Sequence, residues 1–151
     1  MTDYRIEKMR RFVALVLTDG QRIEGEIFLR PTAPRQTRPE RPDDLLNDPS
    51  PFFPMMCDGK VRLVAKANVV VAETSNELDD EFDSPVLGIP VEATLIDGSA
   101  CQGSVFLETR PDRPRLLDFL NSYDARFLPL VAVGRIILVN THSIAHVREV
   151  D

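Results

Sequence analysis

Residues 12–29 read FVALVLTDGQRIEGEIFL, and residues 90–107 read PVEATLIDGSACQGSVFL. In each stretch an apolar run leads into an Asp-Gly pair, and a second run with one internal glycine follows. Asp-Gly between apolar runs is typical of a β-hairpin, because a type I′ turn needs positive φ at both central residues. Each stretch therefore predicts two strands joined by a tight turn, at Asp19-Gly20 and at Asp97-Gly98.

The second strand of each hairpin has the period of two that marks a half-buried strand. One face of this strand carries Ile23, Gly25, Ile27 and Leu29 in the first hairpin, and Cys101, Gly103, Val105 and Leu107 in the second. The glycine shared by both strands predicts a bend or bulge, at which a small sheet curls toward a barrel.

The similarity continues past the hairpins, so the chain contains two copies of one unit. Later matching pairs are Phe52 with Phe127, Pro54 with Pro129, Gly59 with Gly134, and Leu63 with Leu138. Each copy then has a short helical patch, at residues 44–47 and 118–121, and three closing strands, which in the second copy are 127–131, 135–140 and 143–148. We predict a mainly β fold with two tandem, small, five-stranded barrels, each with a short helical segment.

The domain boundaries follow from this repeat. We assign residues 1–73 to the first unit, residues 74–88 to an acidic linker, and residues 89–151 to the second unit. Residues 2–9 are a candidate N-terminal helix. The linker contains five acidic residues without a basic one, which is typical of a solvated segment.

Composition limits the function. The 151 residues are 43% apolar and carry a formal net charge of −6, so nucleic acid and anionic lipid are repelled unless the basic residues are segregated. Two cysteines and no secretion signal indicate a reduced, cytoplasmic protein. No apolar run approaches the ~20 residues of a membrane helix. We therefore expect a cytoplasmic protein that does not enter a membrane.

The pattern resembles the Sm-like (LSm/Hfq-like) family. The first family motif is matched by Leu17, Asp19-Gly20 and Gly25, and again in the second copy. The second motif, between the last two strands, is matched by residues 139–144 and, in the first copy, by residues 64–69. The resemblance implies that each unit is a barrel of Sm-like or SH3-like type with a tip that faces RNA, built here from Lys66, Asn68, Asn140 and His142. Ordinary turn polarity is the alternative, and we favour it for these residues.

Two Arg/Pro-rich connections are the other candidate binding segments. Proline favours extended chain that holds guanidinium groups outward, and guanidinium binds phosphate or carboxylate. The candidates for binding RNA or an acidic partner are Arg35, Arg38 and Arg41, and in the second copy Arg110, Arg113 and Arg115. The alternative is solvated loops that keep the units soluble, and the acidity of the whole chain favours it.

Catalytic and metal sites are not predicted. His142 and His146 would lie ~13 Å apart along a strand, too far for one ion, because a metal binds histidine nitrogen at ~2.1 Å. Asp19 and Asp97 precede glycines in turns, where aspartate is used for its backbone geometry. No nucleophile and base accompany them. We expect no enzyme activity, no metal and no cofactor.

Three functions are carried forward. The first is a non-enzymatic interaction or assembly module. It forms a homo-oligomer through edge strands at residues 69–73 and 144–148, and another protein is a second candidate partner. The second is an Sm-like protein that binds RNA. The third is an enzyme with a pocket between the repeats, for which the sequence has no positive feature.

Overall fold

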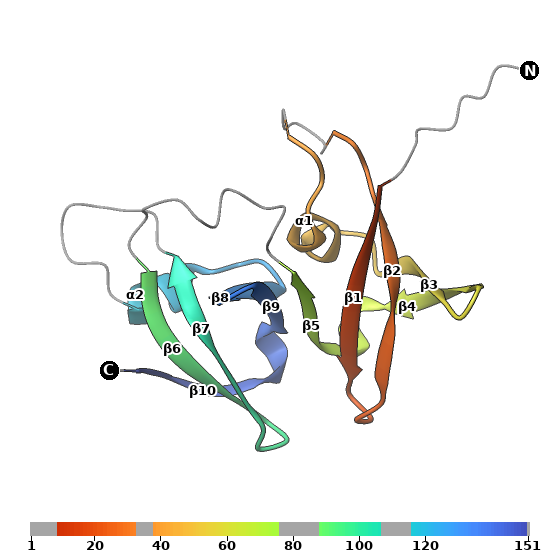
Figure 1. Cartoon of the computed structure of the whole chain (residues 1–151). Helices are drawn as coiled ribbons and strands as arrows, with labels where there is room; N and C mark the ends of the chain where they lie inside the picture. The colour runs from red at the N-terminus through yellow and green to blue at the C-terminus, as the bar shows by residue number, and fades with distance from the viewer. Residues whose placement is uncertain (1–8, 33–37, 76–87, 107–115, 151) are drawn as a thin grey trace, which may run out of the picture. The chain divides into compact units, whose positions relative to one another are not determined.

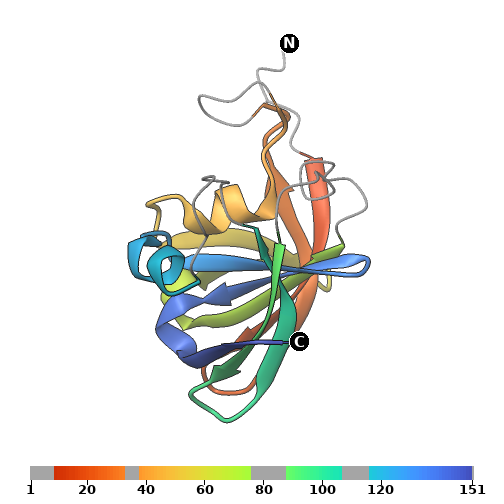
Figure 2. The same cartoon turned by 90° about the vertical axis from the view of Figure 1, so that its left-hand side faces the viewer.

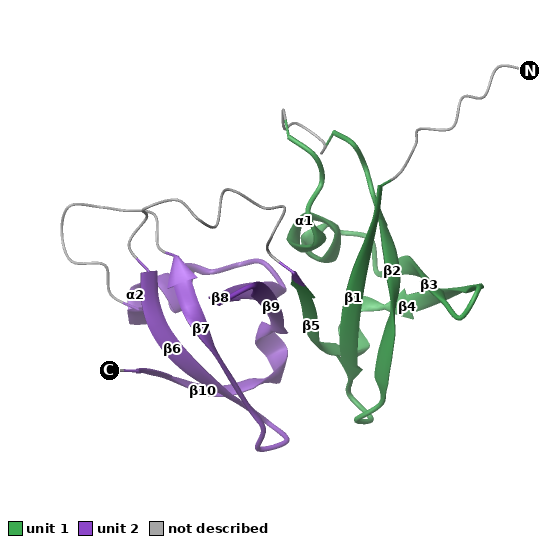
Figure 3. Ribbon diagram, viewed as in Figure 1, with its two compact units in different colours: residues 1–74 green, residues 75–151 purple. Residues whose placement is uncertain are grey.

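The computed structural model describes residues 9–32, 38–75, 88–106 and 116–150. These residues confirm a mainly β protein, with ten strands and two α-helices. The chain divides into two compact units, Met1–Thr74 and Ser75–Asp151, which Figure 3 colours separately. Each unit is described here by itself. The candidate N-terminal helix falls outside the described residues except for Met9, which begins a strand. Most of the acidic linker also falls outside them, and its first residues, Thr74 and Ser75, end the strand Val69–Ser75.

Unit 1 contains five antiparallel strands in the order β5-β1-β2-β3-β4 (Figure 1). The strands are β1 (Met9–Leu17), β2 (Arg22–Leu29), β3 (Phe52–Cys57), β4 (Lys60–Ala65) and β5 (Val69–Ser75). Helix α1 (Pro42–Asn47) lies between β2 and β3 in sequence, and a 3-10 turn, η1 (Lys66–Asn68), joins β4 to β5.

Unit 2 repeats this order as β10-β6-β7-β8-β9. Its elements are β6 (Gly88–Leu95), β7 (Ala100–Phe106), α2 (Leu116–Ser122), β8 (Phe127–Ala132), β9 (Arg135–Asn140), η3 (Thr141–Ser143) and β10 (Ile144–Glu149). Hairpin β6–β7 is long and curved in Figure 1 and Figure 2. In neither unit do the described pairings join the two outer strands, so barrel closure is not shown.

Each unit also contains an equivalent backbone hydrogen bond between two of its turns. Thr18 N donates to Asn68 O at 2.9 Å in unit 1, and Ile96 N donates to Ser143 O at 2.9 Å in unit 2. Both bonds hold the turn after the first strand against the 3-10 turn before the last strand. The repeat seen in the sequence is therefore a repeat of backbone hydrogen bonding as well.

The type I′ prediction for Asp19-Gly20 and Asp97-Gly98 is wrong. Gly20 and Gly98 have φ of 85° and 92°, but Asp58 is the one non-glycine residue with positive φ in the described part of the chain. The carboxylate of Asp19 accepts a hydrogen bond from Gln21 N, and Asp97 accepts one from Ser99 N, which supports a longer turn.

The two-residue turn with positive φ at both positions lies instead between β3 and β4. Its residues, Asp58 and Gly59, have φ of 51° and 76°, and they connect the paired residues Cys57 and Lys60.

The glycine inside each second strand marks a close approach of neighbouring strands. The predicted bulge is not found in the pairing with the first strand, and the predicted bend stays a prediction. Register is continuous through Gly25, opposite Val13, and through Gly103, opposite Val91. A Cβ atom on Gly25 would lie 2.2 Å from the carbonyl oxygen of Met56 on β3. The next strand therefore passes so close that a side chain would collide with it.

Buried apolar side chains from the strands form the core of each unit. In unit 1 these include Val13, Leu15, Ile27, Leu29, Phe53, Met55 and Val69, and in unit 2 Val91, Ala93, Leu95, Val105, Leu128, Leu130 and Val139. Alternation along each strand delivers these residues to one face of its sheet. The opposite faces are then free to differ between the units.

Candidate interaction surface

Taken by itself, each unit has two outer strands, which are β4 and β5 in unit 1 and β9 and β10 in unit 2. Within its unit, β4 pairs with β3, and β10 pairs with β6. The sequence pointed to residues 144–148, within β10, and also to residues 69–73, within β5. Strand β5 pairs with β1, and Val69 and Glu73 have further contacts as well.

Backbone hydrogen bonds show which way these edges point. Val150 N donates to Pro90 O beside β6, so the alternation of an antiparallel ladder turns the N–H groups of Val147 and Glu149 away from β6. In unit 1, Lys66 N donates to Pro51 O beside β3, so the N–H of Leu63 points away from β3. Each edge thus presents backbone donors that an added strand can use.

Hairpin β3–β4 carries apolar side chains on the face that points away from the core. Leu63 lies opposite Pro54, and Val61 lies opposite Met56, so these pairs share one face. The exposed fractions are 57% for Phe52, 53% for Val61 and 72% for Leu63. We call Phe52, Pro54, Met56, Val61, Leu63 and Ala65 the outer face of β3–β4. A contiguous exposed apolar face is uncommon on a monomer and marks an interaction site.

The matching face of hairpin β8–β9 in unit 2 is buried. Phe127 corresponds to Phe52, Ile136 to Val61, and Leu138 to Leu63, and their exposed fractions are 0%, 2% and 1%. The same residue pattern is therefore solvent-exposed in unit 1 and buried in unit 2.

The arginines predicted for binding in unit 1 are engaged with acidic residues of helix α1. Arg38 donates two hydrogen bonds to Asp44, at 2.6 and 3.0 Å, and Arg41 donates to Asp43 at 3.1 Å. Burial acts to raise the pKa of Asp44, but the hydrogen bonds from Arg38 and from the Arg41 backbone, together with the charges of these two arginines, outweigh it and lower the pKa. For Asp43, burial dominates over the nearby Arg41 and raises the pKa. Arg35, Arg110, Arg113 and Arg115 lie outside the described residues.

The residues predicted for the tip between the last two strands divide into two groups. Lys66 is 3% exposed, and its ammonium donates to Asp48 Oδ1 at 2.6 Å. Burial acts to raise the pKa of Asp48, but the hydrogen bonds from Lys66 and Ser50, together with the charge of Lys66, outweigh it and lower the pKa. Asn140 is also buried, and its side-chain oxygen accepts a hydrogen bond from His142 N at 3.0 Å. Asn68 and His142 are exposed.

RNA contact by these residues remains a prediction, and so does contact with an acidic partner. A buried ammonium that already holds a carboxylate is poorly placed to reach an external phosphate. Among the described residues, no group of three His, Cys, Asp or Glu side chains is arranged to hold a metal ion.

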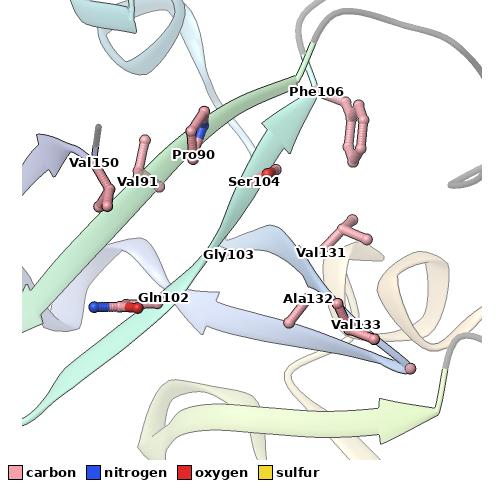
Figure 4. Close-up of a pocket in the computed structure, with 11 residues that line it drawn as sticks. Pro90, Val91, Gln102, Gly103, Ser104, Phe106, Val131, Ala132, Val133 and Val150 are labelled. Carbon is pink, nitrogen blue, oxygen red and sulfur yellow. The ribbon is translucent and has the colours of Figure 1, made fainter.

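Unit 2 has an open groove where β7 and β8 diverge, and Figure 4 shows its lining. The two strands are joined by a single register pair, Ser104 with Val131, and Gly103 adds no side chain. The volume is about 630 Å³, and most of the labelled side chains are apolar. Gln102 in the lining donates to Glu92 at 2.8 Å. The lining combines no nucleophile with a base, so the groove has no arrangement typical of catalysis.

Comparison of the chain with protein-family models, with curated proteins and with solved structures found no match in any of the three. Among the residues that the structure describes, neither helix has the length and apolar character needed to cross a membrane.

Proposed function

We propose that this chain is a non-enzymatic assembly module, in which each five-stranded unit is an Sm-like barrel and the edge strand β10 pairs with a strand of a neighbouring molecule. The observation that carries the proposal is the outward backbone of β10. This strand is bonded to β6 on one side, and the N–H groups of Val147 and Glu149 point to the other. Unpaired edge groups are a template for strand addition.

The side chains along β10 are compatible with such pairing. Arg148 donates to Glu92 at 3.1 Å, so its charge is directed toward β6 and away from the open edge. The bonds from Gln102 and Arg148 also lower the pKa of Glu92, which keeps this carboxylate ionised and available to Arg148. Besides Arg148, the strand carries one other acidic or basic side chain of fixed charge, Glu149 at its end, and Ile144, Ala145 and Val147 are apolar.

The test is the mass of the protein in solution across a range of concentrations. We expect sedimentation velocity to show species heavier than the 17.0 kDa chain as concentration rises. Val147→Pro removes one outward donor without touching the bonds to β6, and it should reduce assembly. Arg148→Ala is the control, because it changes a side chain and leaves the edge backbone intact. Wild-type protein that stays at 17.0 kDa at every concentration contradicts the proposal.

A further inference from the structure

We draw no further inference here: the strongest candidate, the exposed apolar outer face of β3–β4 in unit 1, carries none, because nothing in the described part of the structure shows what covers it.

Discussion

Hairpin β3–β4 in unit 1 and hairpin β8–β9 in unit 2 occupy the same place in their repeats but differ in exposure. Leu63 and Leu138 are matching residues, with exposed fractions of 72% and 1%. Their neighbours Val61 and Ile136 differ in the same way, at 53% and 2%. The difference shows that the same pattern of apolar residues can be exposed in one unit and buried in the other. The apolar character of these residues alone therefore does not predict their exposure.

The turns of these hairpins differ as well. Asp58-Gly59 has positive φ at both residues, whereas in the corresponding turn of unit 2 positive φ is found at Gly134 and not at Val133. Val133 is fully exposed there. A β-branched residue avoids the left-handed region that aspartate tolerates, so the two turns must take different geometries. The repeats have diverged at this turn and at their outer faces while keeping their register.

The largest predicted effect tests the difference in exposure directly. Leu138→Ala should lower the free energy of unfolding by about 3–4 kcal/mol, because it removes a buried side chain and leaves a cavity. Leu63→Ala should change it by no more than about 0.5 kcal/mol, as expected of a surface position. Urea unfolding followed by circular dichroism is suitable, since the chain contains no tryptophan. The protein is kept dilute, so that assembly does not contribute. Equal losses of unfolding free energy in the two variants would contradict the difference in exposure between Leu63 and Leu138.

The next prediction concerns the glycine that faces each of these hairpins. Gly25→Ala should cost about 3 kcal/mol, because its Cβ would lie 2.2 Å from the backbone oxygen of Met56. Gly103→Ala should cost about 1–2 kcal/mol, because its nearest contact is the side-chain Cβ of Leu130 at 2.8 Å. Unfolding midpoints rank the two variants. A smaller loss of stability for Gly25→Ala than for Gly103→Ala would show that β3 shifts to accommodate the added Cβ atom more easily than β8 does.

A third prediction uses the ion pair at the end of β4. Lys66→Met should cost about 2 kcal/mol near neutral pH, because Asp48 loses the cation that offsets its burial. The pKa of Asp48 is lowered in the folded state, so its contribution is present above the unfolded value of 3.8 and is lost as pH falls through the folded value. Wild-type stability should therefore drop more steeply than that of Lys66→Met between about pH 5 and pH 2.

An uncharged hydrogen bond in unit 2 supplies the control for this prediction. Tyr123 directly follows α2, as Asp48 directly follows α1, and its hydroxyl donates to Phe127 O at 2.5 Å. Tyr123→Phe should cost about 1 kcal/mol and leave the slope of stability against pH unchanged. Parallel pH curves for wild type and Lys66→Met would show that the ion pair does not contribute to acid sensitivity.

Much of the architecture could be predicted from sequence because the signals were local. Alternating residues and turn glycines located the strands, and the predicted strand 135–140 coincides with β9. The predicted helical patch at residues 118–121 lies within α2. The turn type at Asp19-Gly20 could not be predicted in this way, because Asp-Gly is compatible with more than one hairpin geometry.

The outer face of β3–β4 was harder to find. In residues 60–65, Val61 and Leu63 alternate with Lys60 and Arg62, which normally assigns the apolar pair to the core. The pairing with β3 shows the reverse, because Arg62 lies opposite the buried Met55. The charge of Lys66 likewise predicted an exposed side chain. Lys66 is instead buried, and its ammonium bonds to Asp48, which lies in the segment after α1. These facts depend on cross-strand and loop partners that local patterns do not specify.

The smallest predicted effect concerns RNA at the tips of the two units. The tip of unit 1 presents Asn68 while Lys66 is buried, and the tip of unit 2 presents His142 while Asn140 is buried. A neutral amide and a single imidazole supply little attraction for phosphate on a chain with a net charge of −6. A gel shift with short single-stranded RNA at low salt should therefore show no complex. A shift that disappears with added salt and is weakened by His142→Ala would instead assign RNA binding to the unit 2 tip.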